Sequence, residues 1–141
     1  DGKSISSSNY SLAWASGRKN VGSYTVKITF KGNYKGTAKR TFSIKPKGTS
    51  LKKLKAKKKS FVAAWKAQKK QTTGYELQYA LNSNFKSGKI VSAGKSKNVS
   101  KVVKGLRAKK RYYVRIRTYK NVKGKKFCSG WSKAKKVVTK K

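Results

Sequence analysis

Polar and apolar residues alternate along much of this chain with a period of two, the pattern that a half-buried β-strand produces. Residues 23–30 show it clearly, because every second side chain is apolar: Tyr24, Val26, Ile28 and Phe30. A turn-forming segment containing Gly and Asn follows at 31–36, and the alternation resumes over 37–44. Residues 1–45 are therefore predicted to form roughly three strands, fewer than the seven or so of a complete β-sandwich. We expect a partial module, either truncated or completed from elsewhere, for example by another protein chain.

The alternation continues beyond residue 50 and predicts seven short strands with turn signals between them: 51–56, 60–66, 74–80, 88–91, 99–103, 111–119 and 133–139. This number and spacing suit two sheets packed face to face. The side chains expected in the core occupy inward positions of these strands and turns: Trp65, Tyr75, Leu77, Leu106, Tyr112, Val114 and Ile116. The alternate positions face outward, so Glu76 is expected in solvent, and Arg115 and Arg117 are expected on an outer sheet face.

The only proline separates the two strand-rich regions. Residues 45–50 contain Pro46 and a Gly, and this composition is typical of a connection between domains. The sequence thus predicts a partial module at 1–45, a linker at 46–50 and a complete domain at 51–141. The predicted fold class is all-β, with an immunoglobulin-like β-sandwich preceded by a partial β-sandwich module.

Four features of the second region resemble the fibronectin type III family: Trp65 in the second strand, the run Gly74–Tyr79 in the third, Leu106 six residues before Tyr112, and the run Tyr112–Arg117. The spacing of Leu106 and Tyr112 is similar to that of the family's tyrosine corner, where the hydroxyl satisfies backbone groups as one sheet turns into the other. The resemblance covers about residues 50–139. It implies a fibronectin type III β-sandwich, in the variant common on surface proteins of Firmicutes.

Residues 9–44 resemble the end of an immunoglobulin-like repeat found in large Gram-positive surface proteins. The resemblance rests on three runs, Asn20–Val26, Gly32–Thr37 and Phe42–Ile44. Together, the two resemblances imply a secreted or cell-surface protein. They also imply that this chain acts in it as a non-catalytic spacer or adhesive module.

Net charge changes this picture most. The chain has 40 Lys and Arg against two acids, Asp1 and Glu76, which gives a formal charge of +38 with no His. Salt bridges cannot balance such a surface, and it favours polyanions because their binding releases counterions. Most of the cations are Lys, whereas base-specific reading favours the bidentate guanidinium of Arg. We therefore expect attraction to charge without recognition of a nucleotide sequence.

The predicted polyanion-binding residues lie in the most basic strands of the second region: Lys52, Lys53, Lys55, Lys57, Arg115, Arg117, Lys133, Lys135 and Lys136. The expected partners are teichoic acid, glycosaminoglycans and extracellular DNA. A structural interpretation competes with this one, because lysines on edge strands also prevent sheets from aggregating edge to edge.

Trp131 lies in a run, Cys128–Ser132, that resembles half of the Trp-Ser-x-Trp-Ser element of related cytokine-receptor modules. The resemblance implies that Trp131 stacks on an Arg of the neighbouring strand. Two interpretations stay open. In the first, the stack stabilises the sheet, and Trp131 joins the predicted structural residues Trp65, Tyr75, Leu106 and Tyr112. In the second, the stack forms a ligand-binding surface of Arg and aromatic groups.

The composition argues against catalysis. With two acids, one Cys and no His, the chain lacks the acid, base and nucleophile pairs of enzymes and the ligand sets of zinc or calcium sites. We predict no catalytic residue, no metal and no cofactor. Some Gram-positive immunoglobulin-like domains use a buried acid to form a Lys–Asn isopeptide bond, but an outward-facing Glu76 would not serve.

Two other functions remain open at this stage. The chain could be a nucleic-acid-binding protein, because its high basic charge and its aromatics interleaved with Arg also suit single strands. It could also be the accessory C-terminal region of an exported hydrolase.

Overall fold

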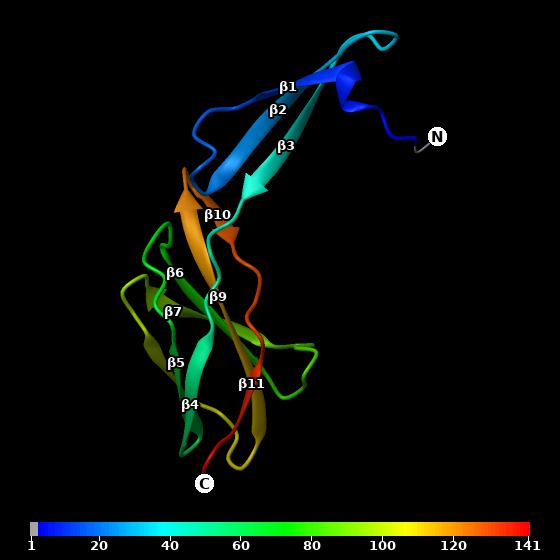
Figure 1. Ribbon diagram of the computed structural model, residues 1–141. Coiled ribbons are helices and arrows are strands. Elements are labelled where there is room, and N and C mark those ends of the chain that lie inside the picture. Colours follow the sequence, from blue (N-terminus) through cyan, green and yellow to red (C-terminus); the bar gives the residue numbers. More distant parts are fainter. Residues whose placement is uncertain (1–2) are drawn as a thin grey trace. The chain divides into compact units, whose positions relative to one another are not determined.

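The computed structural model describes residues 3–141 and divides the chain into two compact units, Asp1–Ile44 and Lys45–Lys141 (Figure 1). Both units are built of antiparallel strands, so the predicted all-β fold class is confirmed. Within residues 3–141 the only helix is a single 3-10 turn, Ser7–Asn9. No helix in the described part of the chain is long and apolar enough to cross a membrane.

The first unit is one three-stranded sheet in the order β1-β2-β3, with bounds Tyr10–Trp14, Gly22–Phe30 and Thr37–Ile44. The register places Leu12 opposite Ile28 and Trp14 opposite Val26, so the apolar side chains share one face. The other face carries mostly Ser, Thr and Lys. Residues 3–44 form no second sheet to cover the apolar face, and Leu12 and Trp14 are 42% and 46% exposed. The prediction of a partial sandwich module is therefore confirmed.

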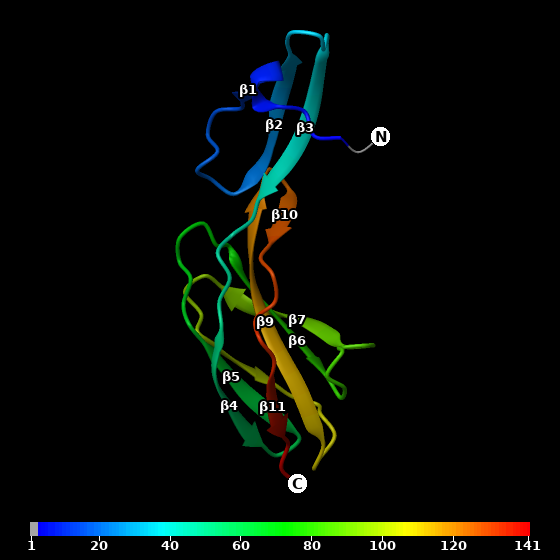
Figure 2. The same ribbon diagram turned by 45° about the vertical axis from the view of Figure 1, so that its right-hand side comes forward.

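The second unit is a sandwich of two antiparallel sheets (Figures 1 and 2). One sheet has the order β4-β5-β8, and the other has the order β10-β9-β6-β7, with β11 also paired to β9. The bounds are Leu51–Lys57 for β4, Ser60–Trp65 for β5, Gly74–Ala80 for β6, Lys89–Lys95 for β7, Ser100–Val103 for β8, Arg111–Val122 for β9, Lys125–Cys128 for β10 and Lys135–Val138 for β11.

The space between these sheets holds the predicted core. All of the residues assigned to it lie in one buried hydrophobic cluster: Trp65, Tyr75, Leu77, Leu106, Tyr112, Val114 and Ile116. The rings of Trp65 and Tyr75 pack with centroids 5.3 Å apart. The indole N–H of Trp65 is buried and has no hydrogen-bond partner within residues 3–141. The Trp65 ring therefore stabilises the core by packing and not by a polar contact.

Two buried tyrosines fasten loops to the core through their hydroxyls. The Tyr112 hydroxyl accepts a hydrogen bond from the backbone N–H of Arg107 at 3.1 Å, beside the buried Leu106. This is the tyrosine corner that the spacing implied. The Tyr75 hydroxyl accepts a hydrogen bond from the backbone N–H of Gln68 at 2.7 Å. Both bonds satisfy backbone groups that strand pairing leaves open.

The prediction of seven strands in this unit missed β10. The long strand β9 pairs with β11 along its first residues and with β10 along its last. The segment between β10 and β11 does not pair with β9 as a regular strand, yet Ser129 and Ser132 hydrogen-bond it to β9. The backbone N–H of Ser129 donates to the carbonyl of Thr118 at 3.0 Å, and its hydroxyl accepts from the N–H of Thr118 at 3.1 Å. Ser132 makes the same pair of bonds with Ile116, at 2.8 and 3.1 Å.

Residues 46–50, which the sequence suggested as a linker, lie within the second compact unit. Pro46 is buried, and the Lys47 carbonyl accepts a hydrogen bond from the Thr118 hydroxyl at 2.8 Å. The Thr49 hydroxyl donates to the carbonyl of Lys66. This segment is thus held against the sandwich by its own hydrogen bonds.

Candidate functional site

Two lysine clusters that are far apart in the sequence meet at one edge of the sandwich. Strands β4 and β11 lie side by side in both ribbon views (Figures 1 and 2). The backbone N–H of Lys59 donates to the carbonyl of Lys140 at 3.1 Å, and the N–H of Lys140 donates to the carbonyl of Lys57 at 2.9 Å. Farther along, the ammonium of Lys135 donates to the carbonyl of Lys52 at 2.9 Å. We call the basic residues of these two segments the lysine edge: Lys52, Lys53, Lys55, Lys57, Lys58, Lys59, Lys133, Lys135, Lys136, Lys140 and Lys141.

Alternation along β4 explains why so many ammonium groups share this edge. Leu54 and Ala56 turn inward and pack against the core cluster. Lys53, Lys55 and Lys57 are exposed on the outer face. Residues two apart on a strand are about 6.8 Å apart, so these three lysines form a row of regularly spaced charges.

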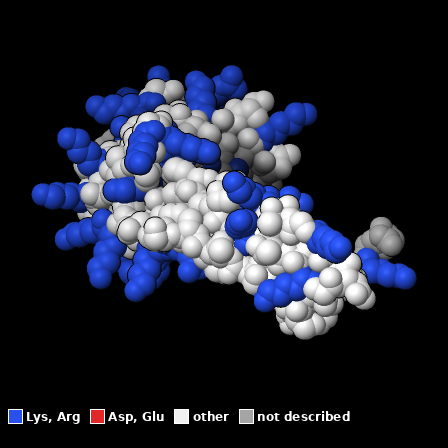
Figure 3. Space-filling view, turned by 90° about the horizontal axis from the view of Figure 1, so that it is seen from above, with Lys and Arg blue, Asp and Glu red and all other residues white. Residues whose placement is uncertain are grey.

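The lysine edge has no Asp or Glu side chain among the described residues. Every one of its lysines is exposed. Glu76 is the one acid within residues 3–141, and it belongs to β6, a strand that is not part of the edge. On the face seen in Figure 3, Lys and Arg side chains project outward and no Asp or Glu is visible. Like charges at this density repel one another, and an anionic polymer relieves that repulsion.

Arg115 and Arg117 lie on the outer face of the sheet that contains β9, and both guanidinium groups lie close to the Trp131 ring. Their guanidinium carbons are 4.9 and 4.3 Å from its centroid. Arg115 also lies 4.0 Å from the centroid of Phe85, and its Nε donates to Gln78 at 2.8 Å. We call Phe85, Arg115, Trp131 and Arg117 the arginine stack. Desolvation, followed by the neighbouring charge of Arg117, lowers the pKa of Arg115 from its ordinary value.

The expectation that Glu76 faces solvent is wrong. Its side chain is only 11% exposed, and its carboxylate binds Arg117 at 2.7 Å and Lys126 at 2.9 Å. Alternation does put Glu76 on the outer face of the sheet, but these two long side chains cover it there. Burial raises the pKa of Glu76, and the hydrogen bonds and charges of Lys126 and Arg117 outweigh that effect and lower it below the ordinary 4.5.

This environment also bears on the isopeptide bond. The hydrogen bond and charge of Glu76 raise the pKa of Lys126, so that amine stays protonated. An isopeptide bond needs a neutral amine and an acid that can supply a proton. An ionised Glu76 beside a charged Lys126 offers neither. The reaction remains disfavoured, although for a different reason than exposure of the acid.

The structure divides the predicted polyanion-binding residues between two surfaces, the lysine edge formed by β4 and β11 and the outer face of β9. The lysines belong to the lysine edge: Lys52, Lys53, Lys55, Lys57, Lys133, Lys135 and Lys136. Arg115 and Arg117 belong to the arginine stack, where the carboxylate of Glu76 already balances Arg117. A ligand of the stack would have to displace interactions that the fold uses. In the edge, such interactions are made by the ammonium groups of Lys135, with the Lys52 carbonyl, and of Lys136, with the Tyr113 ring.

Alternation alone did not assign Gln78, Phe85 or Lys126 to the arginine stack or its ion pairs. The cross-strand register between β6 and β9 could have identified Gln78 as a partner of Arg115. In that register Gln78 lies opposite Arg115, as Glu76 lies opposite Arg117. No comparable pattern marked Phe85, which is buried in the loop after β6.

The two surfaces offer a ligand charged groups and aromatic groups. Within residues 3–141, no three His, Cys, Asp or Glu side chains come together in a way that could hold a metal ion. The lysine edge offers dense point charges, and the arginine stack offers aromatic faces already covered by guanidinium groups. Binding of an extended anion is what the lysine edge can do.

The second unit has the fold of a fibronectin type III-like β-sandwich. Among solved structures, the chain is similar to the FN1-FN3 domains of chicken CNTN1, with a TM-score of 0.58 and 15% identity over 86% of this chain and 44% of that one. It is also similar to a structure described as a myokine, with a TM-score of 0.51 and 14% identity over 70% of this chain and 100% of that one. The chain thus spans less than half of the CNTN1 chain, and at these identities the likeness concerns the fold alone. No family model and no curated protein matches the sequence.

Proposed function

We propose that this chain is a non-catalytic module of a secreted or cell-wall-associated surface protein of a Gram-positive bacterium, which acts as a spacer or adhesive and binds anionic polymers through the lysine edge. One observation carries the proposal. Strands β4 and β11 bring two lysine clusters into a single exposed surface that contains no Asp or Glu side chain among the described residues. Teichoic acid, glycosaminoglycans and extracellular DNA are the partners with suitable chemistry.

The binding would be electrostatic and tolerant of ligand structure. Lysines present mobile point charges and no planar fork for bidentate recognition. Each neutralised nucleic-acid phosphate releases counterions and contributes about −0.7 to −0.9 to the slope of log affinity against log salt concentration. Affinity should therefore depend on how many lysines a polymer can reach at once.

The test compares two triple variants that lose the same charge. Lys53→Gln, Lys55→Gln and Lys57→Gln together remove the row on β4, and Lys97→Gln, Lys101→Gln and Lys104→Gln together remove three exposed lysines outside the edge. Heparin and single-stranded DNA are titrated at several salt concentrations. The β4 variant should bind both polymers more weakly than the control variant, and its slope on DNA should be shallower by about 2. Equal losses in both variants, or strong preference for one base sequence, would overturn the proposal.

We further propose that strands of another protein chain complete the first unit. The support is the apolar face of its sheet, where Leu12 and Trp14 remain about half exposed. The two edge strands, β1 and β3, each pair only with β2 among the described residues. A partner sheet could bury that face or extend either edge.

A further inference from the structure

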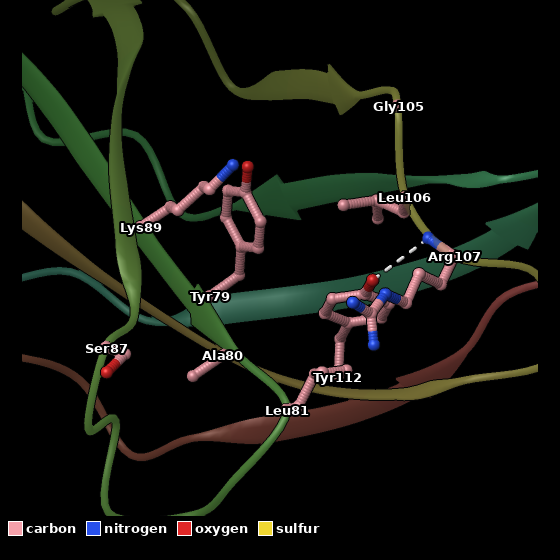
Figure 4. Close-up of a pocket in the computed structure, with 9 residues that line it drawn as sticks. All are labelled: Tyr79, Ala80, Leu81, Ser87, Lys89, Gly105, Leu106, Arg107 and Tyr112. Atoms are coloured by element: carbon pink, nitrogen blue, oxygen red, sulfur yellow. Dashed lines mark hydrogen bonds between the residues drawn. The ribbon is translucent and has the colours of Figure 1, made fainter.

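A depression opens at the end of the second unit where the loop after β6 approaches the loop before β9 (Figure 4). Its volume is about 260 Å³. Its wall combines apolar and aromatic side chains with two cations: Tyr79, Leu81, Leu106, Tyr112, Lys89 and Arg107. This volume suits one six-membered ring with a small substituent, since a cavity of about 150 Å³ holds benzene.

The charged groups of the depression select an anion. Lys89 and Arg107 are both exposed, they come from different strands and loops, and no carboxylate lines the space. Figure 4 shows the ammonium of Lys89 and the hydroxyl of Tyr79 at the same side of the opening, with Arg107 across from them. An anionic group held at this opening would meet cations from two directions.

Tyr79 adds a hydrogen-bond donor. No hydrogen bond joins its hydroxyl to any residue of the described chain, although its ring packs against Phe61 and Tyr112. Burial, and then the proximity of Tyr112, raise the pKa of Tyr79, so the hydroxyl keeps its proton. A half-buried donor without a partner is a group that a ligand oxygen can satisfy.

The loop on one side of the depression is already ordered. The amide of Asn82 donates to the carbonyl of Lys86 at 3.0 Å, and the N–H of Lys86 donates to the Asn84 side chain at 2.9 Å. Phe85 and Ser87 hold positive φ angles of 60° and 57°, which non-glycine residues rarely adopt. The fold thus maintains a strained conformation beside this space, so a ligand would not have to order the loop.

We propose that this depression binds a ring-shaped monoanion, a single acidic sugar unit of the hexuronate class. The carboxylate would lie between Lys89 and Arg107, a ring hydroxyl or carboxylate oxygen would accept from Tyr79, and the ring would lie against the exposed side chain of Leu81. The proposal goes beyond the lysine edge, because neither Lys89 nor Arg107 belongs to it. It describes a shaped site for one unit and not a charged surface for a polymer.

The test uses the full chain labelled with ¹⁵N and followed by NMR during titration with sodium glucuronate. Saturable shifts are expected at amides of residues 79–89 and 105–107. Tyr79→Phe should weaken binding about threefold to tenfold, and Lys89→Gln about tenfold, because both remove a bond to a charged ligand. Lys97→Gln, which removes an exposed lysine elsewhere, should leave the affinity unchanged.

Three further titrations identify what is recognised. Glucose lacks the charge, acetate lacks the ring, and benzoate replaces the sugar with an aromatic ring. Weaker binding of all three supports the proposal. Equal binding of acetate would show that charge alone is read, and tighter binding of benzoate would show that the sugar assignment is wrong. Heparin affinity of Lys89→Gln should stay within about twofold of the parent, so failure of this site can be distinguished from failure of the lysine edge.

Discussion

Replacing Glu76 with Gln should destabilise the second unit by about 2 kcal/mol, an intermediate cost between exposed and buried ion pairs. Exposed pairs contribute about 0.2–1 kcal/mol, and breaking a buried pair costs about 3–5 kcal/mol. The Glu76 side chain is 11% exposed, and those of Arg117 and Lys126 are 24% and 50% exposed. The pair with Arg117 is thus closer to the buried limit, and the pair with Lys126 is closer to the exposed limit.

Thermal unfolding followed by near-ultraviolet circular dichroism measures this effect. For a domain of this size, a loss of about 2 kcal/mol lowers Tm by roughly 10 °C. Lys126→Gln, the matched control, should cost less than about 1 kcal/mol. A double-mutant cycle of Glu76→Gln with Arg117→Gln isolates the energy of the contact from other effects.

Long-range repulsion must be separated from the local contact, because Glu76→Gln also removes the one acid within residues 3–141. At 1 M salt the Debye length is about 3 Å, so distant lysines are screened and most of the remaining cost comes from the direct pair. An unchanged Tm at both low and high salt would refute the reasoning. A cost that disappears at high salt would show that net charge, and not the ion pair, produces the effect.

The same residue should govern stability in acid. The folded-state pKa of Glu76 is lowered from 4.5, so its contribution is present above the unfolded pKa and is lost as pH falls through the folded pKa. Besides Asp1 and the terminal carboxylate, no other acid titrates in this range. The stability of the parent chain should fall below about pH 4.5, while the Glu76→Gln variant should have a nearly flat profile there. Parallel profiles would contradict this assignment.

Three more outcomes are expected. Trp65→Phe should cost clearly less than Trp65→Ala, for which about 3–5 kcal/mol is typical, because the buried indole N–H has no partner within residues 3–141; equal melting shifts would contradict this. The double variant Leu12→Ser, Trp14→Ser should bind much less of an apolar fluorescent dye, since both side chains are about half exposed on the apolar face. The melting temperature of the second unit should stay unchanged. Undiminished dye fluorescence would show that the dye binds elsewhere. Ser132→Ala should lower stability by about 1–2 kcal/mol in denaturant titration, because the buried N–H of Ile116 loses its hydroxyl acceptor.

Alternation predicted the fold well where one side of a strand faces a core. It placed Trp65 and Tyr112 inward because they share a side of their strands with the other apolar residues, and the structure buries both. It failed for Glu76, since alternation identifies the outer face of a sheet but not the side chains that cover it. Strand β10 was missed because Lys125–Cys128 has only four residues with a single strongly apolar one.

The candidate surface was predictable in its residues but not in its assembly. Both lysine clusters were visible as runs in the sequence. That Lys135 reaches the backbone of Lys52, 83 residues away, depends on sheet topology, which local patterns do not encode. The depression beside Tyr79 was not predicted at all, because it depends on how two loops approach each other across the sandwich.

The contact between β4 and β11 also determines how the second unit should respond to tension. The two strands run parallel where Lys58 meets Lys140, and they lie near opposite ends of the unit's chain. Pulling on Lys45 and Lys141 would draw the strands in opposite directions along their own axes. The bonds from Lys59 to Lys140, from Lys140 to Lys57 and from Lys135 to Lys52 would then share the load instead of opening one after another. Because lysines crowd both strands, a bound polyanion that neutralises them would raise the force at which this joint yields.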